Sequence, residues 1–175
     1  MRVEFINPFV SATLDVFRVM LSCELVREPL VAKQEHTPMH EVSGLIGLSG
    51  TCRGMVVVSV GRETAIRAAE IMLSSRPDGL NADVMDAIGE ITNMIAGAAK
   101  SQLEQYSLSI GLPTVITGKC QTITFPSGAR PIAIPFESDI GPVCVQVGLV
   151  EVSETPTPPR TANGTATAGS DAPAK

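Results

Sequence analysis

A row of acidic, amide and glycine residues near the middle of the chain is the part of the sequence best suited to chemistry. It consists of Asp86, Glu90, Asn93 and Gly97, spaced i, i+4, i+7 and i+11. On an α-helix this spacing keeps the row within an arc of about 60°. A carboxylate can pair with a cation, and an amide can orient a water molecule or contact a phosphoryl oxygen. A glycine allows the backbone of another molecule to approach closely. The row therefore predicts a contact surface on one face of a helix.

Helix propensity gives a second reason to consider this row functional. Asn is unfavourable inside a helix, and Gly costs about 1 kcal/mol relative to Ala. A face selected for stability alone would carry Glu, Lys, Gln or Ala, so two unfavourable residues on one stripe favour a surface kept for contact. From the residues alone, the alternative is that the row consists of ordinary solvated residues on a helix surface. The opposite side of the segment is apolar and predicts the core contact, through Val84, Ile88, Ile91 and Ile95.

Three helices are predicted around this row. The helix that carries it should run from Ala82 to about Tyr106, with Asn81 as N-cap and acidic residues in the first turns. An earlier segment, RETAIRAAEIML, should form a helix that ends at the breaker SSRPDG. The first helix should run from Pro8 to about Leu21, capped by Asn7 and with Pro8 in the first helical position. In the RETAIRAAEIML helix the residues expected to face inward are Ala65, Ile66, Ala69 and Leu73.

The rest of the folded region has the composition of β-strands. The order of helix, strands, two helices and strands lacks strict βαβ alternation. It predicts an α/β fold of the α+β type, an antiparallel or mixed sheet with long helices packed on one face. A long helix followed by strands occurs twice, which indicates pseudo-duplicated halves. The predicted extended segments are 25–34 (interrupted by Pro29), 42–48, 55–60 after an SGTCRG turn, 114–119, 121–125, 131–136 and 143–150.

Composition excludes several classes of protein. A net charge of -5 without a basic stripe, and only one Tyr, five Phe and no Trp, argue against a nucleic-acid binder. The four cysteines lie far apart without a C-x-x-C motif, which favours reduced thiols in the cytoplasm. Neither a secretory leader nor an uncharged run long enough to span a bilayer is evident, so no membrane insertion is expected. Residues 1–152 should form one domain, and the Pro, Thr and Ala-rich segment 153–175 should be disordered.

The row forms the pattern D-x-x-x-E-x-x-N-x-x-x-G, which resembles the signature of the CheC/CheX/FliY chemotaxis phosphatases. The flanking Ile88, Gly89 and Ile91 also resemble the family, and the opening EFINPFVSATLDVF resembles the N-terminus of its CheX members. The resemblance covers about residues 1–152. CheC-type members carry a second E-x-x-N pair on the first helix, but here PFVSATLDVFRVML has none, because Asp15 and Arg18 occupy only part of that face. One site per chain is therefore expected, as in CheX members.

This resemblance implies a hydrolase of two-component chemotaxis signalling that acts on the aspartyl phosphate of a CheY-like response regulator. Asn93 would orient the attacking water, Glu90 would dock a lysine of the receiver domain, and Asp86 and Gly97 would contact the partner. No cofactor is expected on this chain, since the Mg²⁺ belongs to the receiver. The resemblance also implies a homodimer, joined through sheet edges. The alternatives are a non-catalytic module that binds a response regulator or a flagellar-switch component.

Other motifs have ordinary interpretations. His36 and His40 are spaced for metal binding on a helix, but Pro38 between them favours a loop or edge strand. The glycines of SGLIGLSGTCRG lack the G-K-[ST] ending of a phosphate loop. A Rossmann fingerprint and a Ser/His/Asp triad are also unsupported. Arg62, Glu63 and Arg67 fit a solvated helix face, with contact to the receiver as the alternative.

Overall fold

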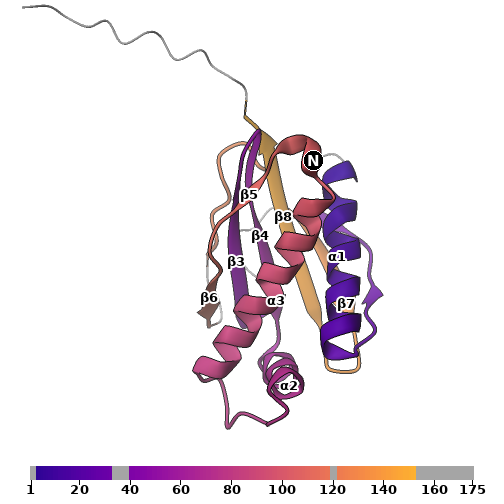
Figure 1. Ribbon diagram of the computed structural model, residues 1–175, viewed down its shortest axis with the longest axis vertical. Coiled ribbons are helices and arrows are strands. Elements are labelled where there is room, and N and C mark those ends of the chain that lie inside the picture. The colour runs from indigo at the N-terminus through magenta and orange to yellow at the C-terminus, as the bar shows by residue number, and fades with distance from the viewer. Residues whose placement is uncertain (1–2, 33–39, 119–121, 153–175) are drawn as a thin grey trace, which may run out of the picture.

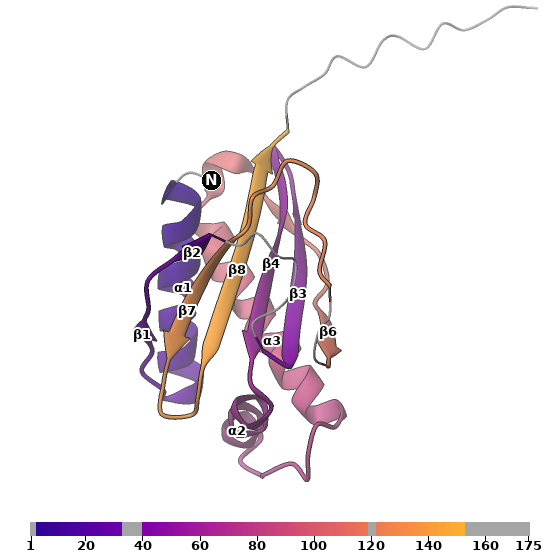
Figure 2. The same cartoon turned by 180° about the vertical axis from the view of Figure 1, so that it is seen from behind.

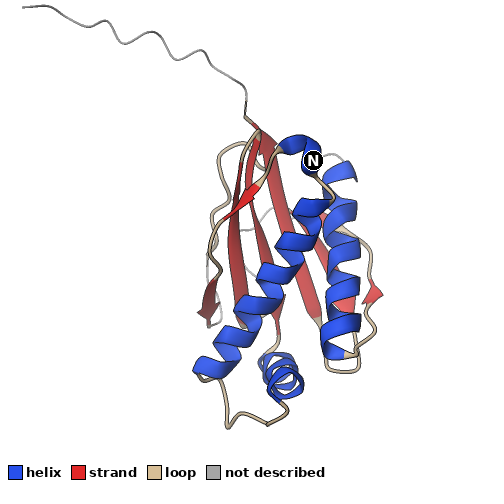
Figure 3. Cartoon of the chain, viewed as in Figure 1, coloured by secondary structure: helices blue, strands red, loops and turns tan. Residues whose placement is uncertain are grey.

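The computed structural model describes residues 3–32, 40–118 and 122–152. Over these residues one antiparallel sheet is covered on one face by two long helices, α1 and α3, which lie side by side (Figures 1 and 3). The shorter helix α2 lies at one end of this layer, next to α3. The fold is thus of the α+β type, as predicted. The helices are α1 (Val3–Leu21), α2 (Arg62–Leu73), α3 (Ala82–Ser101) and the 3-10 helix η1 (Glu104–Tyr106).

The sheet has eight strands within the described residues, and all of its pairings are antiparallel. Its main path runs β1-β7-β8-β4-β3-β5, while β2 also pairs with β7 and β6 also pairs with β3. Figure 2 shows the face of the sheet that the long helices leave open. The strands are β1 (Val26–Arg27), β2 (Val31–Ala32), β3 (Val42–Ser49), β4 (Cys52–Val60), β5 (Ser109–Ile110), β6 (Thr114–Thr117), β7 (Ile132–Glu137) and β8 (Val143–Glu151).

Several predicted elements are confirmed. Helix α2 has the predicted bounds, and α3 begins where the cap at Asn81 predicts. The inward isoleucines of α3 are almost fully buried in the main core, together with Phe9 and Phe17 of α1. The long strands β3, β4, β7 and β8 match predicted segments to within a few residues, and β1 and β2 lie on either side of Pro29. The predicted duplication of the halves stays a prediction, and the segment from Ser153 lies outside the described residues.

The predicted start of the first helix is wrong. Helix α1 begins at Val3, so Pro8 lies inside it and Asn7 is not its cap. The turn before Pro8 carries Phe5 and Ile6, both buried in the core. Burial of these two side chains favours the helical turn more than the missing backbone donor of a proline opposes it.

The predicted end of the third helix is also wrong. Helix α3 stops at Ser101, and the chain turns back through Gln102 into η1. This reversal buries Leu103 and brings the ring of Tyr106 to 4.8 Å from that of Phe5, centroid to centroid. Tertiary packing on α1 thus ends a helix that local periodicity would continue.

Two further corrections concern apolar residues. Leu73, predicted to face inward, is 49% exposed, because α2 ends there and Ser74 takes a left-handed conformation. The predicted strand 121–125 is not a strand over its described residues 122–125. Its alternating Ile123 and Phe125 are nevertheless buried in a small second cluster with Val57 of β4. Alternation there reflects a loop that packs on the sheet.

Candidate active site

Helix α3, which carries the predicted row, has a capping hydrogen bond at each end. At its start the Asn81 side chain accepts a hydrogen bond of 3.1 Å from the backbone N–H of Val84. At its end the N–H of Gln102 donates to the carbonyls of Ala99 and Lys100. The row therefore lies on a helix with a capping hydrogen bond from a neighbouring residue at each end.

Loss of the Asn81 cap should destabilise helix α3 without changing the residues of the row. Replacing a capping Asn with Ala typically costs about 1 kcal/mol. We expect Asn81→Ala to lower the free energy of unfolding by about that amount, measured by urea denaturation. Since Asn81 lies more than one turn before Asp86, activity at a temperature where the variant is folded should be unchanged. An unchanged stability would show that the cap is dispensable.

The side of α3 that faces β3 approaches the sheet very closely at one point. Thr92 is fully buried, and its hydroxyl donates a 2.7 Å hydrogen bond to the carbonyl of Ile88. Opposite it on β3 lies Gly44, where an added Cβ would stand 2.0 Å from Thr92 Oγ1. Only a glycine permits this approach. Because Thr92 immediately precedes Asn93, the contact sets the height of the row above the sheet.

The structure brings the four predicted site residues together on one face of α3. Asp86 and Glu90 are exposed, while Asn93 and Gly97 are half-buried. A Cβ on Gly97 would meet no atom within 4 Å, so its surface is open. Over the described residues, no hydrogen bond or ion pair engages the side chains of Asp86, Glu90 or Asn93. The row is thus a set of polar groups with unused bonding capacity.

Asp86 and Glu90 stand between two hollows in the surface. One lies between α2 and α3, and the other lies between α3 and the start of β6. At the second hollow Gly89 allows close packing, since its Cβ would lie 3.5 Å from Val115 Cγ2. Besides the two carboxylates, the first hollow is lined by Met72, Leu73, Asp83 and Ala87, and the second by Met85, Gly89, Pro113 and Val115.

These lining residues were not predicted from the sequence. Pro113 and Val115 reach α3 through the turn after β5, and Met72 and Leu73 reach it from the end of α2. The only available signal was a run of three apolar residues, Ile71 to Leu73, immediately before a breaker. Of this run, only Leu73 is predicted from the sequence, as an inward-facing residue of the helix.

The face of α1 that carries Asp15 and Arg18 differs from the row on α3. Asp15 and Arg18 form an ion pair with each other, with 2.5 Å between the carboxylate oxygen and the guanidinium nitrogen. Both side chains are exposed, so solvent screens the pair. The charges on this face are therefore matched within the helix, unlike those of the α3 row.

The other candidates named from the sequence are the charged residues of α2 and the two histidines. Arg67 pairs with Glu70 at 3.3 Å, and Arg62 lies 3.9 Å from Glu41, as expected of a solvated face; contact with a receiver stays a prediction. His40 is partly buried, which lowers its pKa, and its backbone N–H donates to Ser59 Oγ. His36 lies outside the described residues. Among those that are described, no cluster of three or more His, Cys, Asp or Glu side chains could hold a metal ion.

The cysteines that can be placed, at positions 23, 52 and 144, are free thiols and are buried. The Cys23 thiol donates to the Asp139 carboxylate at 3.1 Å, and burial together with this contact raises the pKa of Cys23. Cys120 lies outside the described residues. In the part of the chain that the structure covers, no helix combines the length and the apolar character needed to cross a membrane.

Comparison with solved structures defines the class of fold. A CheC-like superfamily protein from Shewanella sp. PV-4 superposes with a TM-score of 0.78 at 31% identity, covering 86% of this chain and 99% of that one. The chemotaxis protein CheX from Vibrio vulnificus gives a TM-score of 0.77 at 34% identity, covering 84% and 99%. The chain therefore has the fold of the CheC-like superfamily.

Sequence comparison narrows the class to one family. Residues 42–137, which include the whole row on α3, match the family described as chemotaxis phosphatase CheX. The CheY-P phosphatase CheX of Thermotoga maritima is 26% identical over 123 residues, covering 68% of this chain and 79% of that protein. CheX of Borrelia burgdorferi, solved as a complex with CheY, BeF₃ and Mg²⁺, shows 25% identity and a TM-score of 0.73, covering 86% of this chain and 100% of that one. This chain belongs to the CheX family of chemotaxis phosphatases.

Proposed function

We propose that this protein hydrolyses the aspartyl phosphate of a CheY-like response regulator, with Asn93 orienting the attacking water and Glu90 docking a lysine of the receiver domain. The observation that carries the proposal is the row of acid and amide groups on α3 of a CheX-family chain, whose side chains have no partner among the residues that the structure describes. Its support from relatives is that one is a CheY-P phosphatase and another forms a complex with CheY.

The proposed chemistry matches what the row can supply. Water attacks the phosphorus, the bond between phosphorus and the aspartate oxygen breaks, and the products are a free carboxylate and inorganic phosphate. Such a transfer depends mainly on positioning and on stabilising charge. The Asn93 amide can accept a hydrogen bond from the water and donate one to a phosphoryl oxygen, so it orients the nucleophile without acting as a base. Helix α3, held over β3 by the Gly44 contact, fixes its position.

The partner completes the site. Mg²⁺, held by the receiver, neutralises charge on the phosphoryl oxygens. Asp86 and Gly97 flank the pair at either end of the row, where we place further contacts with the receiver. Because Asp15 and Arg18 pair with each other on α1, one such site per chain is proposed. The homodimer that the family resemblance implies stays a prediction, which sedimentation velocity can decide.

Loss of the Glu90 carboxylate should weaken docking more than chemistry. We expect Glu90→Ala to raise the receiver concentration at half-maximal rate about tenfold, equivalent to about 1.4 kcal/mol of lost binding, with a smaller effect on kcat. The measurement is the rate of phosphate release against receiver concentration. Glu104→Ala, which removes an exposed carboxylate away from the row, is the matched control. Equal effects of the two substitutions would exclude a specific role for Glu90.

A non-catalytic module is the second candidate, because the exposed row could bind a receiver without promoting hydrolysis. The half-buried amide of Asn93 favours an enzyme, since a carboxylate alone would serve docking. Binding of the activated receiver without any acceleration of acyl-phosphate decay would establish the module instead.

A further inference from the structure

The end of helix α2 exposes apolar side chains beside the row. Ile71 and Leu73 are 38% and 49% exposed, and Met72 between them is half-buried. The last turn of α2 carries no basic residue to complement the helix dipole. Met72 packs against the main core, whereas the exposed parts of Ile71 and Leu73 contribute little to folding and indicate a surface kept for contact.

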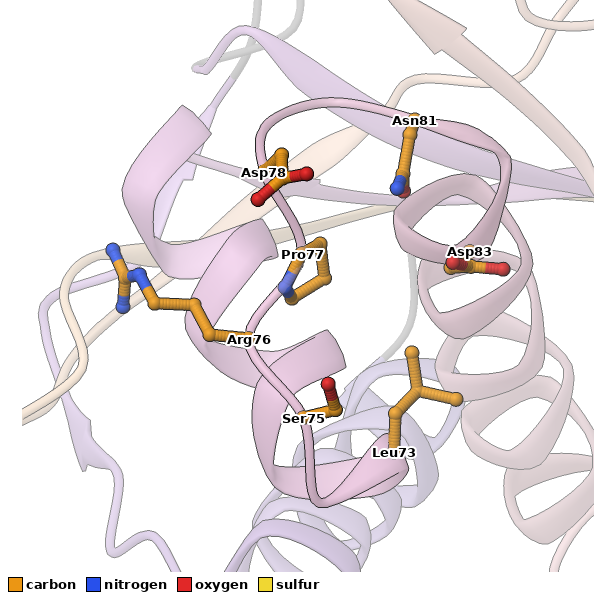
Figure 4. Close-up of a pocket in the computed structure, with 7 residues that line it drawn as sticks. All are labelled: Leu73, Ser75, Arg76, Pro77, Asp78, Asn81 and Asp83. Carbon is orange, nitrogen blue, oxygen red and sulfur yellow. The ribbon is translucent and has the colours of Figure 1, made fainter.

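Met72 and Leu73 form one wall of a groove whose lining also includes Glu90. The hollow between α2 and α3 has a volume of about 260 Å³ and is bounded by Met72 and Leu73 on one side and by Ala87 on the other. Leu73 and Asp83 also line a neighbouring hollow of about 370 Å³ under the loop that joins the two helices. Figure 4 shows both residues there, Leu73 at the end of α2 and Asp83 in the first turn of α3. The two hollows therefore adjoin at Leu73 and Asp83, which line both of them.

The charges around the groove indicate which partner side chains it can bind. Its α3 side carries the carboxylates of Asp83, Asp86 and Glu90, which have no ion-pair partner within the described residues. The nearby cation Arg76 is already engaged by Glu63 and Glu70. An acidic rim over an apolar wall is complementary to a segment that presents an apolar side chain next to a basic one.

We propose that this groove binds an apolar side chain of the same receiver domain whose basic residue pairs with Glu90, and that Leu73 determines affinity for the receiver. The proposal rests on the proposed function, because the groove opens onto the row that would engage the receiver. Met72 at the inner wall suits this task, since its flexible thioether adapts to different partner side chains.

The test is a binding titration combined with kinetics. A purified CheY-like receiver, loaded with BeF₃⁻ and Mg²⁺ as a stable mimic of the acyl phosphate, is titrated with the full-length protein and with Leu73→Gln. We expect Leu73→Gln to raise Kd about tenfold, as for an apolar residue that contributes strongly to an interface. The value of kcat for phosphate release at saturating receiver should not change.

The matched control is Leu30→Gln, at a leucine of similar exposure (44%) between β1 and β2, toward the opposite edge of the sheet. It should bind as the wild type does. Since Leu and Gln have similar helix propensities, Leu73→Gln should fold with unchanged stability.

The outcomes separate this proposal from the proposed function. If the wild type accelerates acyl-phosphate decay but Leu73→Gln binds as tightly as the wild type, the groove proposal is overturned and the phosphatase stands. If Leu73→Gln weakens binding but the wild type does not accelerate decay, the groove stands and the phosphatase fails. Equal weakening by Leu30→Gln would also overturn the proposal. So would a dimer in sedimentation experiments that Leu73→Gln dissociates, because a second copy of this chain would then occupy the groove.

Discussion

Replacing Asn93 with alanine is expected to lower kcat for receiver dephosphorylation about a hundredfold while leaving the protein at least as stable. Removal of one preorganised polar group at a reacting centre costs on the order of 10²–10³ in rate. The stability should not fall, because alanine is the better helix former and the Asn93 side chain makes no hydrogen bond within the described residues. The measurements are phosphate release at saturating receiver and a urea denaturation curve for the same variant.

Asn81→Ala is the matched control, because it makes the same substitution on the same helix but at the N-cap instead of in the row. Asn81→Ala should lower stability and leave kcat unchanged, whereas Asn93→Ala should lower kcat and leave stability unchanged or higher. A kcat for Asn93→Ala within a few fold of the wild type would remove Asn93 from the mechanism. Loss of activity together with loss of stability would indicate a structural role.

Gly44→Ala should destabilise the protein by about 1–3 kcal/mol, the usual cost of overpacking a close-packed interior. Its Cβ would stand 2.0 Å from Thr92 Oγ1 and 2.9 Å from Thr92 Cβ. Thr92 cannot move aside easily, since it is fully buried and bonded to the Ile88 carbonyl. Helix α3 must therefore move away from β3, which displaces Asn93, so the activity of the folded variant should fall as well.

Gly47→Ala on the same strand is the matched control. An added Cβ there would meet nothing within 4 Å, so we expect a change near zero in the free energy of unfolding. The double substitution Gly44→Ala with Thr92→Ala should recover part of the loss, because it removes the closest atom. Urea denaturation of the variants measures these differences. If Gly44→Ala were as stable as Gly47→Ala, the close approach would not set the position of α3.

The candidate site could be predicted because it is local. Asp86, Glu90, Asn93 and Gly97 lie on one helix, and helical periodicity alone places them on one face, opposite the buried isoleucines. The start of that helix was also predictable, since the Asn81 cap is a short-range interaction. The strands β4 and β8 are long and strongly apolar, and this makes them recognisable without knowledge of their partners.

The rest depends on contacts between distant segments. The true ends of α1 and α3 are set by burial of Phe5 and Leu103, which no local rule reports. The walls of the two hollows come from Leu73 and Pro113, which reach α3 only through the tertiary fold. The meeting of Gly44 and Thr92 likewise joins residues 48 positions apart. The polar groups of the row are therefore predictable from the sequence, whereas the surface around them is not.

The most direct test of the account is the decay of acyl phosphate on a purified CheY-like receiver in Mg²⁺, with and without this protein. We predict faster decay with the wild-type protein and decay at the receiver's own rate with Asn93→Ala. Equal decay rates with and without the wild-type protein, for a receiver that binds it, would contradict the phosphatase and leave a binding module.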